Sequence, residues 1–189
     1  MNARLLPLIG IPESTDAPVS AADLRSALER HHAECVGWAM ACCGFDRSEA
    51  SDVLQDAYLK VLDGRASFRG EATFRTWLFG VIRRTAAEHR RSVLRRVTRF
   101  LRANGHDAPS TDQEVGEAMD ASATADRLRH ALRQLPSRQR EVLHLVFHDG
   151  MTVDAAASVL GVSVGSARTH YARGKARLRE LLGIAGSGR

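Results

Sequence analysis

Apolar residues in this 189-residue chain recur at the spacing of an α-helix, and this periodicity constrains the fold more than any other feature of the sequence. The segment 47–62 shows it plainly, because its apolar residues line one stripe of a helix: Ala50, Val53, Leu54, Ala57, Val61 and Leu62. We find no segment in which apolar and polar residues alternate between hairpin turns, as they would in a half-buried strand. The sequence therefore predicts an all-α fold.

Turn residues divide the rest of the first half into further helices. A first helix is expected over about 21–43, with Ser20 available as its N-cap and Gly44 at its end. The segment 63–74 interrupts the helical pattern and contains Thr73, an N-cap candidate for the next helix. That helix continues into an arginine-rich run, which predicts one or two basic amphipathic helices.

The last third of the chain begins with two helices on either side of a proline. A helix over 123–135 should end before Pro136, and Ser137 should cap a buried helix that ends at Gly150. The apolar residues expected to be buried in that second helix are Val142, Leu143, Leu145, Val146 and Phe147.

Two more helices that meet at a glycine turn, with the second one cationic, are typical of a helix-turn-helix unit. Thr152 and Ser163 are their N-cap candidates and Gly161 marks the turn. On the inner face of the second helix, Gly174 would let a neighbouring helix approach closely; the other inner residues are Val164, Ala167, Tyr171 and Leu178. The outer face has polar groups suited to base edges and phosphates, although a solvated surface gives the same pattern. Its residues are Ser166, Thr169, His170, Arg173 and Arg177, flanked by Arg168 and Lys175.

Charge is distributed in blocks, although the net charge is only +5. The segment 83–102 holds eight arginines against one acid, whereas 103–126 holds six acids and no Lys or Arg. The acidic segment also has the Asn, Gly, Pro and Ser content of a flexible linker. We therefore expect two small helical domains joined by a flexible acidic linker: a disordered leader over 1–19, a first domain over 20–102, the linker over 103–123, a second domain over 124–183 and a tail over 184–189.

The sequence argues against several classes of protein. No apolar run approaches the roughly 20 residues of a membrane-spanning helix, so we expect no membrane insertion and a cytoplasmic location. Cys35, Cys42 and Cys43 are odd in number, which favours free thiols. We see no catalytic group of residues, so we expect a protein that is not an enzyme and uses no cofactor.

The cysteines and the nearby pair His31 and His32 also invite an interpretation as a metal or redox site, since His31 and Cys35 lie one helical turn apart. The spacing does not suit a tetrahedral zinc ion, and cysteine is frequently a small buried residue. The sequence therefore predicts no metal site.

Two blocks of the sequence resemble a known family of transcription initiation factors. Residues 135–182 are similar to region 4 of the sigma-70 family: LPSRQREVLHLVFHDGMTVDAAASVLGVSVGSARTHYARGKARLRELL. Region 2 of the extracytoplasmic-function (ECF, group IV) subfamily resembles residues 50–62, ASDVLQDAYLKVL, and 68–84, FRGEATFRTWLFGVIRR. The resemblance implies a sigma factor that binds bacterial RNA polymerase core, recognises the −35 and −10 promoter elements and assists DNA melting.

The resemblance further implies partners and residue roles. The partners are the clamp helices and flap of polymerase core, promoter DNA and an anti-sigma protein. Core binding is implied for Asp52, Gln55, Asp56 and Tyr58. Contacts with the −10 element are implied for Phe68, Arg69, Thr73, Phe74, Arg83, Arg84, Arg90 and Arg91. For the −35 element, matched positions and the outer face together indicate Ser166, Arg168, Thr169, His170, Arg173 and Arg177.

Several of these residues have a plainer interpretation. Phe74 and Trp77 share an inward stripe with Leu78 and are expected mainly in the core, while Tyr58 fits either role. The acidic side of the 47–62 helix is, without the resemblance, a solvated surface. His170 departs from the arginine usual in the family, so no −35 base preference is implied.

Two other functions remain open at the level of sequence. The first is a transcriptional activator with a response-regulator type of helix-turn-helix, although residues 20–100 show neither strands nor a phosphoacceptor pattern. The second is a helical metal or redox sensor that uses the cysteines and binds DNA as its output.

Overall fold

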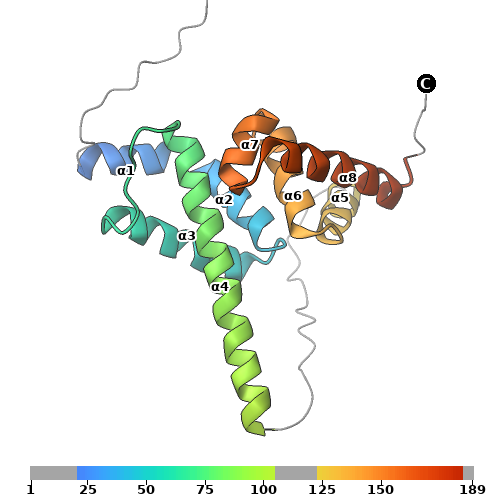
Figure 1. Ribbon diagram of the computed structural model, residues 1–189, viewed down its shortest axis with the longest axis horizontal. Helices are drawn as coiled ribbons and strands as arrows, with labels where there is room; N and C mark the ends of the chain where they lie inside the picture. Colours follow the sequence, from blue (N-terminus) through green and yellow to red (C-terminus); the bar gives the residue numbers. More distant parts are fainter. Residues whose placement is uncertain (1–20, 105–122, 185–189) are drawn as a thin grey trace, which may run out of the picture.

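The computed structural model describes residues 21–104 and 123–184, and every regular element in these ranges is a helix (Figure 1). The elements are α1 (Ala21–Arg30), α2 (His32–Cys42), α3 (Arg47–Leu62), α4 (Phe74–Asn104), α5 (Ala123–Arg133), α6 (Ser137–Leu143), the π-helical turn η1 (His144–His148), α7 (Val153–Leu160) and α8 (Val164–Leu182). The all-α expectation is confirmed for these residues. None of their helices combines the length and the apolar character needed to span a bilayer. The leader, Ser20, linker residues 105–122 and tail residues 185–189 lie outside the described ranges.

Helices α1 to α4 pack around Trp38, whose side chain is fully buried. The Trp38 indole Nε1 donates a 2.9 Å hydrogen bond to the backbone oxygen of Phe79, and the two rings stack with centroids 5.7 Å apart. The single helix expected over 21–43 is wrong, because α1 and α2 meet at His31. The His31 backbone, with φ −98° and ψ 4°, turns the chain so that both helices contact α3 (Figure 1).

Helix α3 begins and ends where the sequence predicts, and α4 is one long helix. Asp46 caps α3 by accepting a 2.8 Å hydrogen bond from the Glu49 backbone N–H. Thr73 caps α4 as expected, because its Oγ1 accepts a 3.2 Å hydrogen bond from the Thr76 backbone N–H. The C-terminal part of α4 projects beyond the other helices (Figure 1).

Side-chain caps also fix two helix starts in the second half. Thr152 and Ser163 each accept a 3.1 Å hydrogen bond from the backbone N–H three residues on, as the sequence predicts. The Ser137 cap is wrong: α6 begins at Ser137 itself, and its N-cap is Pro136, which has no side-chain acceptor.

The expected burial of Phe147 is also wrong, since 63% of this residue is exposed. In η1 the Asp149 backbone N–H reaches back five residues to the His144 carbonyl, at 3.2 Å. A π-helical turn holds more residues than an α-helical turn and so rotates the side chains that follow it. Phe147 therefore points away from the core, and its ring stacks on Tyr171 of α8 with centroids 5.7 Å apart.

The two halves pack together around a continuous apolar core, with α4 against α7 and α2 against α6 (Figure 1). The second half contributes Val142, Leu145, Met151, Ala156, Val159 and Leu160 to the cluster that contains Trp38. The sequence distinguishes two units but gives no sign of this packing, because an apolar stripe does not reveal which element will cover it.

Candidate nucleic-acid interface

The turn between α7 and α8 has the geometry of a helix-turn-helix unit. Gly161 ends α7 in the left-handed region, with φ 59° and ψ 41°, which glycine adopts without strain. Gly174 lies buried where α8 packs on α6. A Cβ at Gly174 would be 3.1 Å from the Gln139 Cβ and 3.2 Å from the Leu143 Cδ1. The close approach expected at Gly174 is confirmed, and it sets which face of α8 points outward.

Five of the six residues expected to contact the −35 element are exposed on α8: Ser166, Arg168, Thr169, Arg173 and Arg177. The sixth, His170, is half-buried. Arg168 lies 3.7 Å from Asp154, and Arg177 donates to Glu180 at 3.0 Å. Both contacts join largely exposed groups, so solvent weakens them and a phosphate can displace them.

The two aromatic residues implied in −10 recognition, Phe68 and Phe74, meet Trp77 where the segment between α3 and α4 joins the first turn of α4. Phe68, Phe74 and Trp77 form a cluster with ring centroids 5.3 to 5.6 Å apart. All three are half-buried, so each ring keeps some surface in contact with solvent. Arg69 and Thr73 beside them are exposed.

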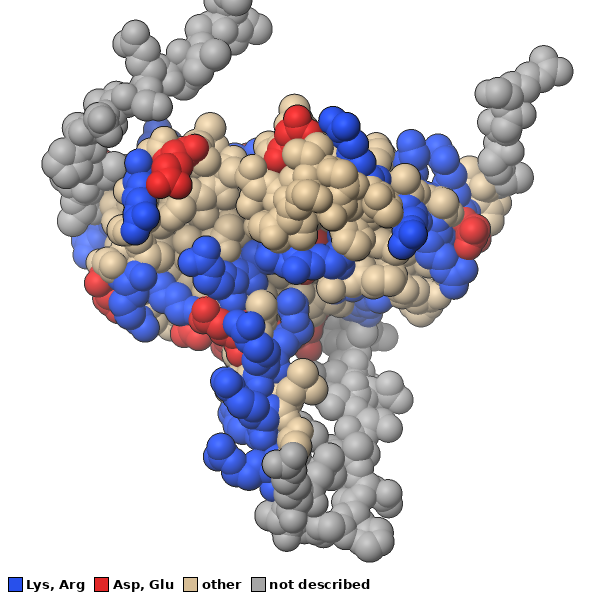
Figure 2. Space-filling view, viewed as in Figure 1, with Lys and Arg blue, Asp and Glu red and all other residues tan. Residues whose placement is uncertain are grey.

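The four α4 arginines named for the −10 element fall into two pairs. Arg84 and Arg91 are exposed. The Arg83 Nε donates to Glu141 of α6 at 3.0 Å, and the Arg90 Nη1 donates to the Cys42 carbonyl at 2.6 Å. Figure 2 shows Lys and Arg side chains along the projecting part of α4, where the exposed residues include Arg95, Arg96 and Arg99. This surface has the charge needed to follow a phosphate backbone.

The residues implied in core binding do not all share one surface. The side of α3 that faces an open hollow against α4 carries Asp52, Gln55 and Asp56, all exposed. Tyr58 instead packs toward α2, where its hydroxyl lies 3.2 Å from the His32 Nδ1. Burial, with the adjacent Cys35 thiol, raises the pKa of the Tyr58 phenol, so the hydroxyl stays protonated.

Arginine side chains also join the two halves, a role that the sequence analysis missed. The Arg75 Nε donates to Glu34 of α2 at 2.7 Å, and its Nη2 donates to the Asp149 carbonyl at 3.0 Å. Burial alone would raise the pKa of Glu34, but hydrogen bonds from Arg75 and His31 hold it below its usual value. The only signal in the sequence is that Arg75 lies in the segment 68–84, which resembles region 2 of the ECF subfamily.

Arg140 of α6 makes a second link between the halves. Its guanidinium is buried and donates to the carbonyls of Ala41 at 2.9 Å and Leu135 at 3.1 Å. Burial lowers the pKa of Arg140, although an arginine keeps its charge at any physiological pH. The only sign of this role in the sequence is the position of Arg140 just before the apolar segment that begins at Val142.

The His and Cys residues singled out by the sequence do not converge as metal ligands. His31 lies beside Glu34 and His32 beside Tyr58, and the three cysteines are buried free thiols. One group among the described residues does bring three ligand atoms together: His144, His148 and Asp149.

Comparison with known proteins assigns both halves to one family. The model for sigma-70 region 2 matches residues 27–97, and the model for sigma-70 region 4 matches residues 125–178. The ECF RNA polymerase sigma factor SigM of Mycobacterium tuberculosis is 34% identical over 142 residues, which are 74% of this chain and 67% of SigM. SigL of the same organism is 31% identical over 160 residues, which are 82% of this chain and 88% of SigL.

Solved structures agree on the fold. The sigma factor RpoE from Bartonella quintana, in complex with the anti-sigma factor NepR, matches with a TM-score of 0.72 at 24% identity, over 87% of this chain and 99% of RpoE. Two helical units, one ending in an exposed helix-turn-helix face, define an initiation factor of the sigma-70 type. The chain belongs to the ECF subfamily of RNA polymerase sigma factors. It directs promoter-specific transcription initiation, and sigma factors are initiation factors rather than catalysts.

Proposed function

We propose that the chain directs initiation by holding RNA polymerase core through α3 while it contacts the −10 element through residues 68–74 and the −35 element through α8. The observation that carries this proposal is the outer face of α8. Its polar and cationic side chains are exposed directly after a capped helix-turn-helix turn. An uncovered face of this kind is what a recognition helix offers to the major groove.

At the −35 element, the first turns of α8 would enter the major groove. Ser166 and Thr169 are short enough to exchange hydrogen bonds with base edges, and Arg173 has the forked geometry that suits a guanine or a phosphate. Arg177, one turn further on, would contact the backbone. Phosphate contacts would set the position of the helix and base contacts its specificity.

At the −10 element, the cluster of Phe68, Phe74 and Trp77 would receive an unstacked base. Each stacked base contributes about 1–3 kcal/mol that duplex DNA cannot gain at the same place. This difference in binding free energy favours the melted strand. Arg69 and Thr73 would add polar contacts, and the exposed Arg84 and Arg91 would follow the phosphates.

Core polymerase would bind the acidic side of α3. Asp52 and Asp56 are exposed carboxylates with Gln55 beside them, and they complement a basic partner surface such as the clamp helices. Tyr58 would contribute from the flank of α3, and the second half would meet the flap.

Simultaneous contact with both promoter elements requires the two halves to separate. The −35 and −10 elements are about 25 base pairs apart, which is about 85 Å of duplex at about 3.4 Å per base pair. A compact chain of this length has a radius of gyration of only about 16 Å. We therefore propose that the packed form is a resting state, and that opening frees Arg83 from Glu141 for DNA.

We also propose that an anti-sigma protein binds this chain, in the cytoplasm where RNA polymerase works. The fold it shares with RpoE, whose structure contains the anti-sigma factor NepR, supports this. A partner that binds both halves would hold the chain away from core polymerase.

Transcription with purified bacterial core polymerase tests the proposal. The full chain is added to core and fragmented genomic DNA, and transcript starts are sequenced with core alone as the control. Starts that depend on the chain and share elements near −35 and −10 support the proposal. If no start depends on the chain, or if the chain fails to bind core in a pull-down, the activator and sensor alternatives take its place.

A further inference from the structure

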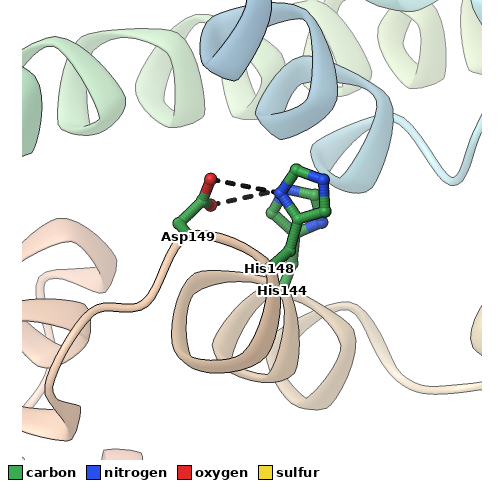
Figure 3. A group of neighbouring side chains, drawn as sticks. All are labelled: His144, His148 and Asp149. Carbon is green, nitrogen blue, oxygen red and sulfur yellow. Dashed lines mark hydrogen bonds and ion pairs between the residues drawn. The ribbon is translucent and has the colours of Figure 1, made fainter.

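Three potential metal ligands meet at the boundary between the two halves. His144 and His148 lie one above the other on η1, with ring centroids 4.5 Å apart, and the Asp149 carboxylate faces both rings (Figure 3). The Asp149 Oδ2 lies 3.4 Å from the His144 Nε2, and the Asp149 Oδ1 lies 3.3 Å from the His148 Nδ1. The π-helical turn brings the two imidazoles and the carboxylate to one side.

Two atoms of this group lack the hydrogen bonds that buried polar atoms normally make. The His144 Nε2 and the Asp149 Oδ2 are both buried without a hydrogen-bond partner. The Asp149 side chain is 1% exposed and that of His144 is 11% exposed. Buried polar atoms without a hydrogen bond are rare in proteins, and these two lie 3.4 Å from each other, as two ligands of one cation would.

Two of the three ligand separations are close to those of a tetrahedral zinc site, in which ligands at about 2.0–2.1 Å from Zn²⁺ lie about 3.3 Å apart. They join the His144 Nε2 to the Asp149 Oδ2 and the His148 Nδ1 to the Asp149 Oδ1, and the ligand atoms of the three residues all lie within 4.8 Å of one another. Small rotations of the two imidazole rings about a soft torsion would aim both lone pairs at one point. The His148 side chain is 62% exposed, so an ion can enter past it and a water can complete the coordination.

Arg75 is the group that opposes a cation here, since its Nη2 lies 3.4 Å from the Asp149 Oδ1. The same guanidinium donates to Glu34 at 2.7 Å and to the Asp149 carbonyl at 3.0 Å. If the Asp149 Oδ1 turned to a metal ion, Arg75 would still donate to Glu34 and to the Asp149 carbonyl. The Asp149 Oδ2 has no hydrogen-bond partner that a metal ion would have to displace.

We propose that His144, His148 and Asp149 form a binding site for Zn²⁺ or a similar divalent transition metal. The donor set of two imidazoles and one carboxylate is typical of such ions, and Mg²⁺ and Ca²⁺ prefer all-oxygen ligands. The site lies against α2, where the His144 ring is 5.8 Å from that of Trp38, and a Cβ added at Gly37 would be 3.4 Å from the His148 Cε1. Metal binding would therefore occur at the contact between the two halves.

Zinc titration of the full, untagged chain tests this site. The chain is stripped with EDTA and desalted, and Zn²⁺ is titrated in competition with a chromophoric chelator. We expect one equivalent to bind, and His144→Ala, His148→Ala and Asp149→Asn each to weaken binding by at least about tenfold. Co²⁺ should give the visible absorption of a tetrahedral site in the native chain and lose it in His148→Ala.

The matched control is His130→Ala, since His130 is an exposed histidine of α5 in the same half. It should leave zinc affinity unchanged. His148 is largely exposed, so the His148→Ala chain should fold, and its circular dichroism melt checks this. The proposal is overturned if Zn²⁺ does not bind, or if His148→Ala binds it as tightly as the unchanged chain does. Loss of binding in His130→Ala would equally contradict it.

Discussion

Arg83 of α4 and Glu141 of α6 form an ion pair across the boundary between the two halves, with 3.0 Å between Nε and Oε2. The Glu141 side chain is 1% exposed and that of Arg83 is 16% exposed, so water screens the pair little. The guanidinium named for promoter contact is thus held in the packed chain by a carboxylate of the other half. This relationship connects the stability of the packed form with the availability of Arg83.

Glu141→Gln should weaken the packed form, because it leaves the Arg83 guanidinium partly buried without its counter-charge. We expect the free energy of unfolding to fall by about 1–3 kcal/mol, measured by urea denaturation. The control is Glu88→Gln, which removes an α4 carboxylate that is 46% exposed and paired with Lys60, and should change stability by less than about 1 kcal/mol. Equal effects of the two substitutions would contradict a structural role for the buried pair.

Gly174→Ala tests the close packing of α8 on α6. Alanine favours a helix over glycine by about 1 kcal/mol, but here the new methyl would lie 3.2 Å from the Gln139 backbone oxygen and 3.1 Å from its Cβ. Overpacking costs about 1–3 kcal/mol, so we expect a net loss of stability. Gly80→Ala is the matched control, because Gly80 lies inside α4 with nothing within 4 Å of its added Cβ. Thermal melts should show Gly80→Ala stabilised, and a stabilised Gly174→Ala would refute the tight contact.

Local signals in the sequence predicted local structure well. Thr73, Thr152 and Ser163 accept the expected capping hydrogen bonds, since a cap needs only a backbone N–H three residues away. Gly161 likewise takes the left-handed conformation that ends α7. The outer face of α8 followed from helical periodicity once its start was fixed.

The ion pairs that the sequence did not predict depend on contacts between distant segments, whereas the break at His31 and the π-helical turn are local features that its helical spacing does not reveal. Arg83 and Glu141 are 58 positions apart, and nothing in either neighbourhood identifies the partner. Phe147 is exposed because a π-helical turn shifts the helical register, and the apolar spacing in the sequence gives no sign of that turn. The same turn brings His144 and His148 together, and their i, i+4 spacing followed by Asp149 was the one signal available.

The three thiols should react slowly in the folded chain. Burial raises the pKa of Cys35 to about 11 and that of Cys43 to about 12, and it raises the pKa of Cys42 well above its ordinary value. The thiolate is the reacting species. A thiol pKa that is higher by about two units, as for Cys35, therefore lowers the thiolate fraction at pH 8 about 100-fold. Ellman's reagent should label the native chain slowly at pH 8, faster as the pH rises toward 11, and at once in urea. Rapid labelling of the native chain would favour the redox-sensor alternative.

Arg173→Ala should weaken the binding of the chain to a short DNA duplex that carries only the −35 element. Arg173 is exposed on the outer face of α8, about two turns after the helix begins. A lost base contact costs about 1–3 kcal/mol and relaxes preference at one position, whereas a lost phosphate contact weakens all sequences and lowers the salt slope by about 1. Titrations at several salt concentrations, by fluorescence anisotropy on a promoter found in the transcription experiment, separate the two cases. Arg179→Ala removes the same charge from the last turn of α8, and it should change the affinity by less than about threefold. If both substitutions weaken binding equally, the net charge of α8 and not its outer face carries the affinity.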